Sequence, residues 1–93
     1  MEYTHVEGKD QGKIVLYALS TCVWCKKTKK FLEDQKVAYD YIYIDLLPEE
    51  KQEELEEYIG KFNESLSYPT IIFNDTDCVV GYKPGKIKGA LKK

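Results

Sequence analysis

The chain has few of the residues that build disulfide frameworks, metal sites or membrane spans. It contains three cysteines and one histidine in 93 residues, and three cysteines are too few, and odd in number, for a secreted disulfide scaffold. No apolar run is long enough to cross a bilayer, and a formal net charge of −2 does not indicate a nucleic-acid-binding protein. Residues 1–7 lack the basic start and apolar stretch of a secretion signal. We therefore expect a cytoplasmic protein with no nucleic-acid or membrane partner.

The order of apolar and polar segments predicts a single α/β domain. Residues 13–19 form a continuous apolar run, typical of a central strand covered on both faces. The predicted elements are, in order, a strand over 13–19, a helix over 23–35, a strand over 37–45, a helix from 48 to about 62, strands over 71–73 and 78–81 joined by an Asn-Asp turn, and a short helix after 84–85. A right-handed crossover makes the first two strands parallel. We expect a flexible lead-in over 1–12 and one domain over 13–93.

The second predicted strand alternates in a way that assigns its two faces. Tyr39, Tyr41 and Tyr43 fall on one face, and Ile42 and Ile44 on the other. The tyrosines have the composition of a stacking platform for nucleic acid, but the acidic neighbours argue against that use. Packing on the face of a sheet is the interpretation that we prefer.

Two cysteines, Cys22 and Cys25, lie three positions apart where the strand-like run meets the helix-like run. The N–H groups and partial positive charge at a helix start stabilise a thiolate, and a spacing of three returns the second sulfur to the first. Zinc sites share this spacing but usually need a second pair, and only Cys78 and His5 remain. We therefore predict a redox-active dithiol with no metal ligand set. We interpret Cys78 as a small buried hydrophobe and His5 as a solvated side chain.

Charge is unevenly distributed along the chain. Residues 20–36 hold five lysines against two acids, residues 82–93 hold five lysines and no acid, and residues 45–61 hold seven acids and two lysines. If the fold brings the two lysine-rich segments together, the dithiol lies in a positive field. Such a field speeds encounter with an acidic partner and weakens with salt.

The chain resembles the glutaredoxin family of the thioredoxin superfamily from Lys13 to Leu91. The resemblance rests on Tyr17–Cys25 as strand and dithiol, on Tyr68-Pro69-Thr70, and on a hairpin that ends at Gly81. Within the family the chain is similar to NrdH-type redoxins of archaea and anaerobic bacteria, which carry Cys-Val or Cys-Ile and a segment like Gly81-Tyr82-Lys83-Pro84. The resemblance implies a thioredoxin-like (glutaredoxin) fold, with a four-stranded mixed sheet, three flanking helices, and Pro69 cis and beside Cys22.

The same resemblance implies a thiol–disulfide oxidoreductase without a bound cofactor. Cys22 attacks a substrate disulfide and Cys25 resolves the mixed disulfide. The residues expected to line the substrate groove are Thr21, Trp24, Tyr68, Pro69, Gly81 and Tyr82, with the Tyr68 backbone pairing with an extended substrate segment. The implied partners are disulfide-containing proteins, with ribonucleotide reductase as one client, and the chain is expected to be a monomer.

Two departures from the family pattern bear on the electron donor. Leu19 stands where glutathione-dependent members carry a lysine, and Lys83 and Pro84 stand where they carry acids. Each lost charge-assisted contact is worth about 1.5–3 kcal/mol, so we predict weak glutathione binding. We expect a flavin or ferredoxin-linked reductase of the thioredoxin reductase class as donor. The alternatives are a glutathione-dependent glutaredoxin, an iron–sulfur or metal carrier with Cys22 as a ligand in a dimer, and a pure binding module.

Overall fold

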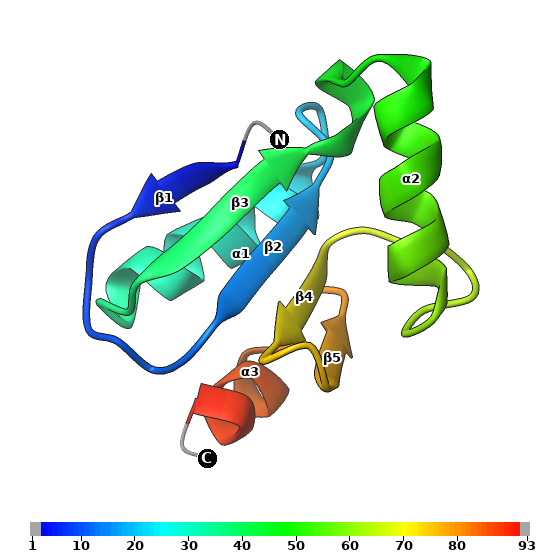
Figure 1. Ribbon diagram of the computed structural model, residues 1–93. Helices are drawn as coiled ribbons and strands as arrows, with labels where there is room; N and C mark the ends of the chain where they lie inside the picture. Colours follow the sequence, from blue (N-terminus) through cyan, green and yellow to red (C-terminus); the bar gives the residue numbers. More distant parts are fainter. Residues whose placement is uncertain (1–2, 92–93) are drawn as a thin grey trace.

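The computed structural model describes residues 3–91, and within them the chain forms one five-stranded sheet in the order β1-β3-β2-β4-β5 (Figure 1). The strands are β1 (Thr4–Val6), β2 (Ile14–Ala18), β3 (Tyr39–Tyr43), β4 (Thr70–Phe73) and β5 (Asp77–Val80). The helices are α1 (Val23–Asp34), α2 (Glu49–Gly60) and α3 (Pro84–Leu91), with a 3₁₀ helix, η1 (Ile44–Leu46), after β3. Residues 1–2 of the expected lead-in and Lys92 and Lys93 of the lysine-rich C-terminal segment lie outside the described residues.

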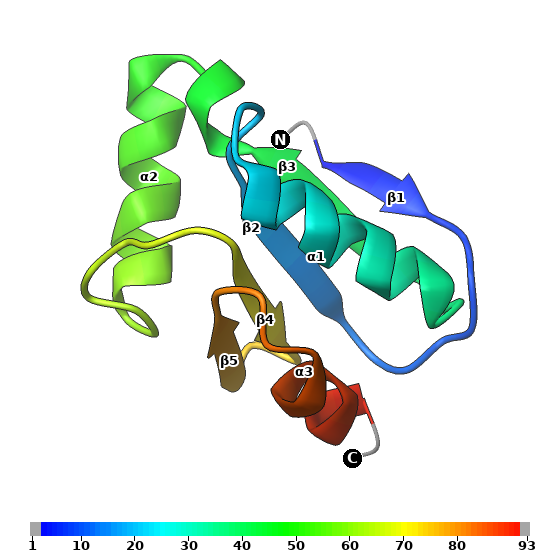
Figure 2. The same cartoon turned by 180° about the vertical axis from the view of Figure 1, so that it is seen from behind.

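The helices divide between the two faces of the sheet. α1 and α3 cover one face and α2 covers the other (Figures 1 and 2). One core cluster joins Leu32 of α1 and Ile87 of α3 to the sheet, and the other joins Leu55 and Ile59 of α2 to it. All five residues of β2 are buried, which confirms the prediction of a central strand.

The predicted order and directions of the later strands are confirmed. β2 and β3 are parallel, β2 and β4 antiparallel, and β4 and β5 form an antiparallel hairpin. Asn74 and Asp75 in its turn both have positive φ, 54° and 57°, the left-handed conformation that Asn and Asp tolerate better than most residues.

The expected count of four strands is wrong, because β1 adds a fifth. It pairs antiparallel with β3, with His5 opposite Asp40 and Val6 opposite Tyr39. The ring Nδ1 of His5 lies 2.7 Å from the Asp40 carboxylate, and Val6 packs against the core. The His5 side chain is therefore exposed, as predicted, and also hydrogen-bonded to Asp40 at the edge of the sheet. This strand lies inside the segment predicted to be a flexible lead-in.

The second predicted strand ends earlier than expected. β3 stops at Tyr43, and the chain turns into η1 where the alternation predicted strand through Asp45. The assignment of faces is confirmed, because Tyr39 belongs to the α1 side of the core and Ile42 and Ile44 to the α2 side. None of the helices in residues 3–91 is long and apolar enough to cross a membrane.

Candidate active site

Cys22 occupies the N-cap position of α1. Its backbone is extended, with φ −85° and ψ 117°, and its Sγ accepts a hydrogen bond from the backbone N–H of Cys25 at 3.2 Å. The first N–H groups of a helix have no partner inside the helix, so an anion at the N-cap satisfies one of them and meets the positive end of the helix dipole. The side chain is partly exposed. The sulfur is thus both open to solvent and placed where negative charge is stabilised.

Cys25 lies in the first turn of α1 and is 1% exposed. Burial raises the pKa of the Cys25 thiol, and a hydrogen bond to the Cys22 side chain raises it further. The expected juxtaposition of the two side chains is therefore present. The buried sulfur therefore keeps its proton at pH values where a solvated thiol loses it.

Asp45, in η1, holds the loop that precedes Cys22. Its carboxylate accepts hydrogen bonds from the Ser20 backbone N–H at 2.8 Å and the Ser20 hydroxyl at 2.5 Å. Burial disfavours the charged form of Asp45, but the bonds from Ser20 outweigh this effect and lower the pKa of the carboxyl. Sequence reasoning missed Asp45. The signal was available, because β2 and β3 are parallel with Ala18 opposite Tyr43, so the residues two positions beyond these meet at the same sheet edge.

The loop before β4 presents the cis peptide. The Tyr68–Pro69 bond is cis, as the resemblance implied, and the Pro69 carbonyl accepts a hydrogen bond from the Gly81 N–H at 2.8 Å. Burial raises the pKa of Tyr68, with smaller contributions from Glu56 and from Cys25, which places Tyr68 within electrostatic reach of the dithiol. Gly81 has φ +84°, a conformation that favours glycine. The structure thus joins Pro69 to Gly81, while direct contact of Pro69 with Cys22 stays a prediction.

A buried amide supports this loop from the α2 side. The Asn63 side-chain N–H group donates to the Ser67 carbonyl at 3.0 Å and to the Thr70 hydroxyl at 3.2 Å, and its carbonyl accepts from Ser65. Asn63 carries no motif signal, and its role was missed because asparagine in a loop more often marks a turn. It fixes the segment that leads into Tyr68 and Pro69.

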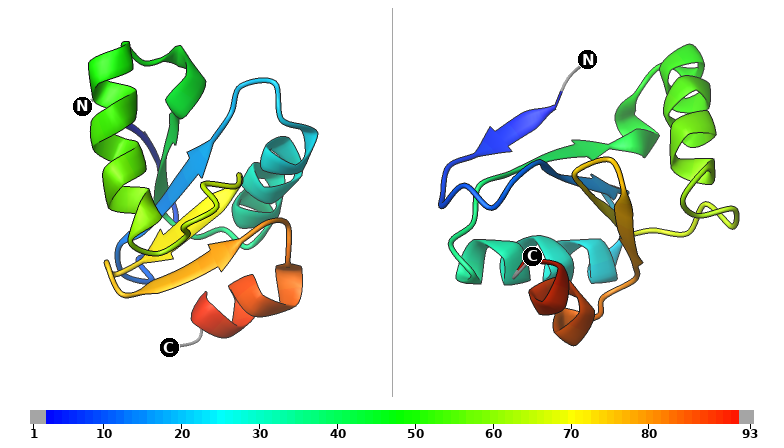
Figure 3. Two further views of the ribbon diagram at one scale, coloured as in Figure 1. Left: turned by 90° about the vertical axis from the view of Figure 1, so that its right-hand side faces the viewer. Right: turned by 60° about the horizontal axis from the view of Figure 1, so that its bottom comes forward.

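An aromatic stack joins the start of α1 to the segment before α3. Trp24 and Tyr82 are stacked with ring centroids 6.0 Å apart, and Tyr82 meets Phe31 edge to face at 6.4 Å. The ammonium groups of Lys27 and Lys88 lie over the Trp24 and Phe31 rings at 4.5 and 6.0 Å. Figure 3 shows α3 on the same side of the sheet as α1. The two lysine-rich segments therefore come together, as expected, over their described residues.

The surface around Cys22 combines exposed apolar side chains with this positive charge. Val23 and Trp24 follow Cys22 directly and are 62% and 55% exposed, and Leu46, in η1 beside Asp45, is 67% exposed. Thr21 is exposed in the turn before them. The segments around Cys22 therefore expose apolar side chains as well as positive charge.

The third cysteine lies on a different element from the dithiol. Cys78, on β5, is half-buried, and burial raises the pKa of its thiol. Within residues 3–91, no group of three or more histidine, cysteine, aspartate and glutamate side chains is arranged to hold a metal ion.

Comparison with known proteins agrees with this geometry. The family model described as Glutaredoxin matches residues 14–78. The crystal structure of the glutaredoxin from Methanosarcina mazei Go1 is 47% identical with a TM-score of 0.94, covering 100% of this chain and 90% of that one. Methanosarcina acetivorans methanoredoxin is 50% identical to this chain with a TM-score of 0.88, and the match covers 92% of this chain and 90% of methanoredoxin. The glutaredoxin-like NrdH-redoxin of Escherichia coli is 23% identical to this chain and shares its fold with a TM-score of 0.66. The match covers 83% of this chain and 92% of the NrdH-redoxin.

These findings confirm the resemblance and the thioredoxin-like fold that it implied. The family match spans the central strand, the dithiol and the cis-proline loop, and the identity to the two Methanosarcina proteins is twice that to the NrdH-redoxin. The chain belongs to the glutaredoxin family of the thioredoxin superfamily and is a thiol–disulfide oxidoreductase.

Proposed function

We propose that the chain reduces disulfides in proteins, with Cys22 as the attacking thiol and Cys25 as the resolving thiol. The observation that carries this assignment is the difference between the two sulfurs. Cys22 is partly exposed and accepts the Cys25 N–H at the start of α1, while Cys25 is buried behind it. The partly exposed sulfur of Cys22 is accessible to a substrate disulfide, and the buried Cys25 lies beside Cys22, where it can resolve the mixed disulfide.

The reaction follows as two exchanges of sulfur partners. The Cys22 thiolate attacks one substrate sulfur, the substrate S–S bond breaks, and the other substrate sulfur leaves as a thiolate that takes a proton. Cys25 then loses its proton and attacks Cys22 Sγ, which releases the second substrate sulfur. The substrate gains two electrons and two protons, and the chain is left with a Cys22–Cys25 disulfide.

Trapping the intermediate tests this order. Cys25→Ser should accumulate a mixed disulfide between Cys22 and a protein substrate, detectable by mass on a non-reducing gel. Cys22→Ser should accumulate none. Cys78→Ser is the matched control and should reduce the substrate at the rate of the unchanged chain. A mixed disulfide formed through Cys25 in the Cys22→Ser chain would reverse the assignment.

The substrate groove that we propose consists of Thr21, Trp24, Tyr68, Pro69, Gly81 and Tyr82. Support comes from the Trp24–Tyr82 stack and from the backbone hydrogen bond between Pro69 and Gly81, the residue before Tyr82, which link the start of α1, the cis-proline loop and the segment before α3. The lysines around them favour a disulfide protein with an acidic rim. Lys26→Glu with Lys27→Glu should slow reduction of such a substrate and flatten its dependence on salt. Lys61→Glu, at the far end of α2, is the control.

For the electron donor we propose a flavin or ferredoxin-linked reductase of the thioredoxin reductase class, with glutathione as the alternative. Leu19 stands at the position of the glutathione-binding lysine and packs against the α2 core cluster, so it offers no cation. Rates of reduction of the Cys22–Cys25 disulfide by glutathione and by such a reductase should differ in favour of the reductase. Fast turnover with glutathione alone would overturn this choice.

The remaining proposals concern the setting of the reaction. From the resemblance we propose ribonucleotide reductase as one client and a monomer as the working form. We propose the cytoplasm as the compartment, since a reduced dithiol is maintained there. Iron content after anaerobic purification distinguishes a disulfide reductase, which should contain almost no iron, from an iron–sulfur cluster carrier, which would be coloured.

A further inference from the structure

A second site lies on the opposite face of the sheet from α1. A cavity of about 420 Å³ opens between α2, the edge of β1, and the turn between β4 and β5. Val15 and Leu55 contribute apolar lining, and three tyrosines, Tyr3, Tyr17 and Tyr58, stand around it. Its volume is in the range of small-ligand sites. The residues that line it include neither cysteine of the dithiol nor any residue of the proposed substrate groove.

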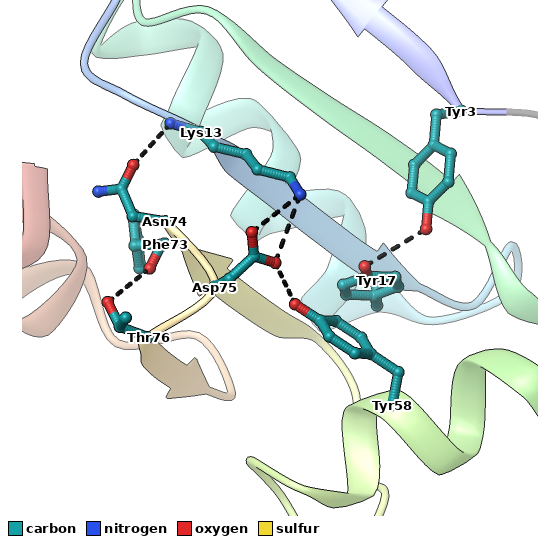
Figure 4. Close-up of polar contacts among 8 residues, drawn as sticks. All are labelled: Tyr3, Lys13, Tyr17, Tyr58, Phe73, Asn74, Asp75 and Thr76. Carbon is teal, nitrogen blue, oxygen red and sulfur yellow. Dashed lines mark hydrogen bonds and ion pairs between the residues drawn. The ribbon is translucent and has the colours of Figure 1, made fainter.

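The three tyrosine rings around the cavity are inclined to one another. The Tyr3 and Tyr17 centroids are 6.3 Å apart at 80°, and those of Tyr17 and Tyr58 are 6.4 Å apart at 56°. Their hydroxyls are tied down, because Tyr3 and Tyr17 share a hydrogen bond at 3.4 Å and Tyr58 donates to Asp75 (Figure 4). Burial raises the pKa of Tyr17 and of Tyr58, so both rings stay neutral phenols. Inclined neutral aromatic faces attract a cation through the ring quadrupole.

The charged side chains around the cavity also favour a cation. Three carboxylates, Asp40, Glu54 and Asp75, line it against one ammonium, that of Lys13, which is bound to Asp75 at 3.0 Å. The hydrogen bond from the α2 tyrosine, and then Lys13, lower the pKa of Asp75, which keeps it ionised. Lys51 lies 3.8 Å from Glu54, and His5 Nδ1 lies 2.7 Å from the Asp40 carboxylate. The three carboxylates still outnumber the two ammonium groups, whereas lysines surround the dithiol.

We propose that this cavity binds a methylated ammonium group. A methylated ammonium is a weakly hydrated cation with an apolar surface, so it uses the aromatic faces, the aliphatic lining and the carboxylates together. An anion would be disfavoured by the excess of carboxylates over ammonium groups, and a neutral apolar molecule would gain nothing from that charge. This site is independent of the redox reaction proposed above.

The test compares two ligands of one shape on the full-length reduced chain. Choline is titrated against its neutral isostere, in which carbon replaces the nitrogen, and proton–nitrogen correlation spectra follow the amides of Val15 and Leu55. Choline should shift them in a saturable way, and the isostere should bind about tenfold more weakly, the ratio that about 1.4 kcal/mol of cation–π attraction provides. Equal binding of the two, or no shift with choline, overturns the proposal.

A peptide carrying trimethyl-lysine is titrated in parallel to identify the source of the group. Tighter binding of the peptide than of choline, with an unmethylated peptide inert, assigns the group to a protein partner. Tighter binding of choline assigns it to a free small molecule. Binding of both lysine peptides alike would overturn the preference for a methylated group.

Variants separate the ring from its hydroxyl. Tyr58→Leu removes an aromatic face and should weaken choline binding at least fivefold, whereas Tyr58→Phe keeps the face and should stay within about twofold. Glu54→Gln, at an exposed position on α2, should weaken binding without affecting the core and serves if Tyr58→Leu fails to fold. Tyr82→Leu, on the dithiol side, is the control and should bind choline unchanged. Unaltered affinity in both Tyr58→Leu and Glu54→Gln would refute the site.

Discussion

The contact between Asp45 and Ser20 predicts a variant that is less stable and yet easier to deprotonate at Cys25. Asp45→Asn removes the charge and keeps one acceptor oxygen, so one of the two bonds from Ser20 is lost or reversed. The same carboxylate raises the pKa of Cys25 by charge repulsion, after the larger effects of burial and Cys22. The substitution should therefore weaken the loop and lower the pKa of the resolving thiol.

The size of the stability effect follows from the exposure of Asp45. A hydrogen bond to a charged group contributes about 1.5–3 kcal/mol when well shielded. Asp45 is exposed, and water and salt reduce such contributions, so we expect a loss of about 1 kcal/mol. For a domain of this size that corresponds to a fall in Tm of about 4–8 °C.

Two measurements check this prediction. Thermal unfolding followed by circular dichroism gives the change in Tm. Thiolate absorbance against pH, measured with and without Asp45→Asn in a Cys22→Ser, Cys78→Ser chain, gives the titration of Cys25 alone. Glu57→Gln removes an exposed charge from α2 and is the control. If Asp45→Asn behaves like Glu57→Gln in both measurements, Asp45 does not hold the loop before the dithiol.

Three further predictions concern the rest of the fold. Asn63→Ala leaves the polar groups of the cis-proline loop without their buried partner, so it should cost about 1–3 kcal/mol in urea unfolding and slow disulfide reduction; an unchanged rate would separate the loop from catalysis. Ile59→Ala, at a position 0% exposed, should cost about 2–5 kcal/mol, whereas the exposed Glu57→Ala should stay within about 0.5 kcal/mol. The hydrogen bond from Lys29 lowers the pKa of Glu33 below that of a solvated glutamate, so the contribution of Glu33 to stability is complete above the unfolded pKa and is lost as pH falls through the folded pKa. Urea unfolding at a series of acidic pH values should show a smaller decrease in the free energy of unfolding for Glu33→Gln than for the unchanged chain.

The dithiol could be predicted from sequence because its chemistry requires particular residue types at a fixed spacing. Cys22 and Cys25 are only three positions apart in the chain, so a strand-to-helix junction already determines most of their geometry. The cis peptide before Pro69 followed from the family resemblance rather than from any local pattern. The order of apolar and polar segments and the family resemblance together predicted the fold, except for the edge strand β1.

What sequence reasoning missed depends on distant partners. β1 is three residues long and mostly exposed, too short for alternation to be read, and its pairing with β3 decides its structure. Ser20 and Asp45 are 25 positions apart, and neither belongs to a motif. The tyrosine cavity collects residues from the strands, α2 and the β4–β5 turn, so no single segment could have revealed it.

If Cys22 captures the substrate as we propose, the position of Cys25 beside it determines which thiol resolves the mixed disulfide. A thiol from solution must diffuse to the linked sulfur of Cys22, whereas Cys25 is already in contact with it and enters the reaction at a very high effective concentration. On the proposed order of attack, the time for which a substrate stays linked to Cys22 then depends on loss of the Cys25 proton, which burial disfavours, more than on the concentration of free thiols in solution.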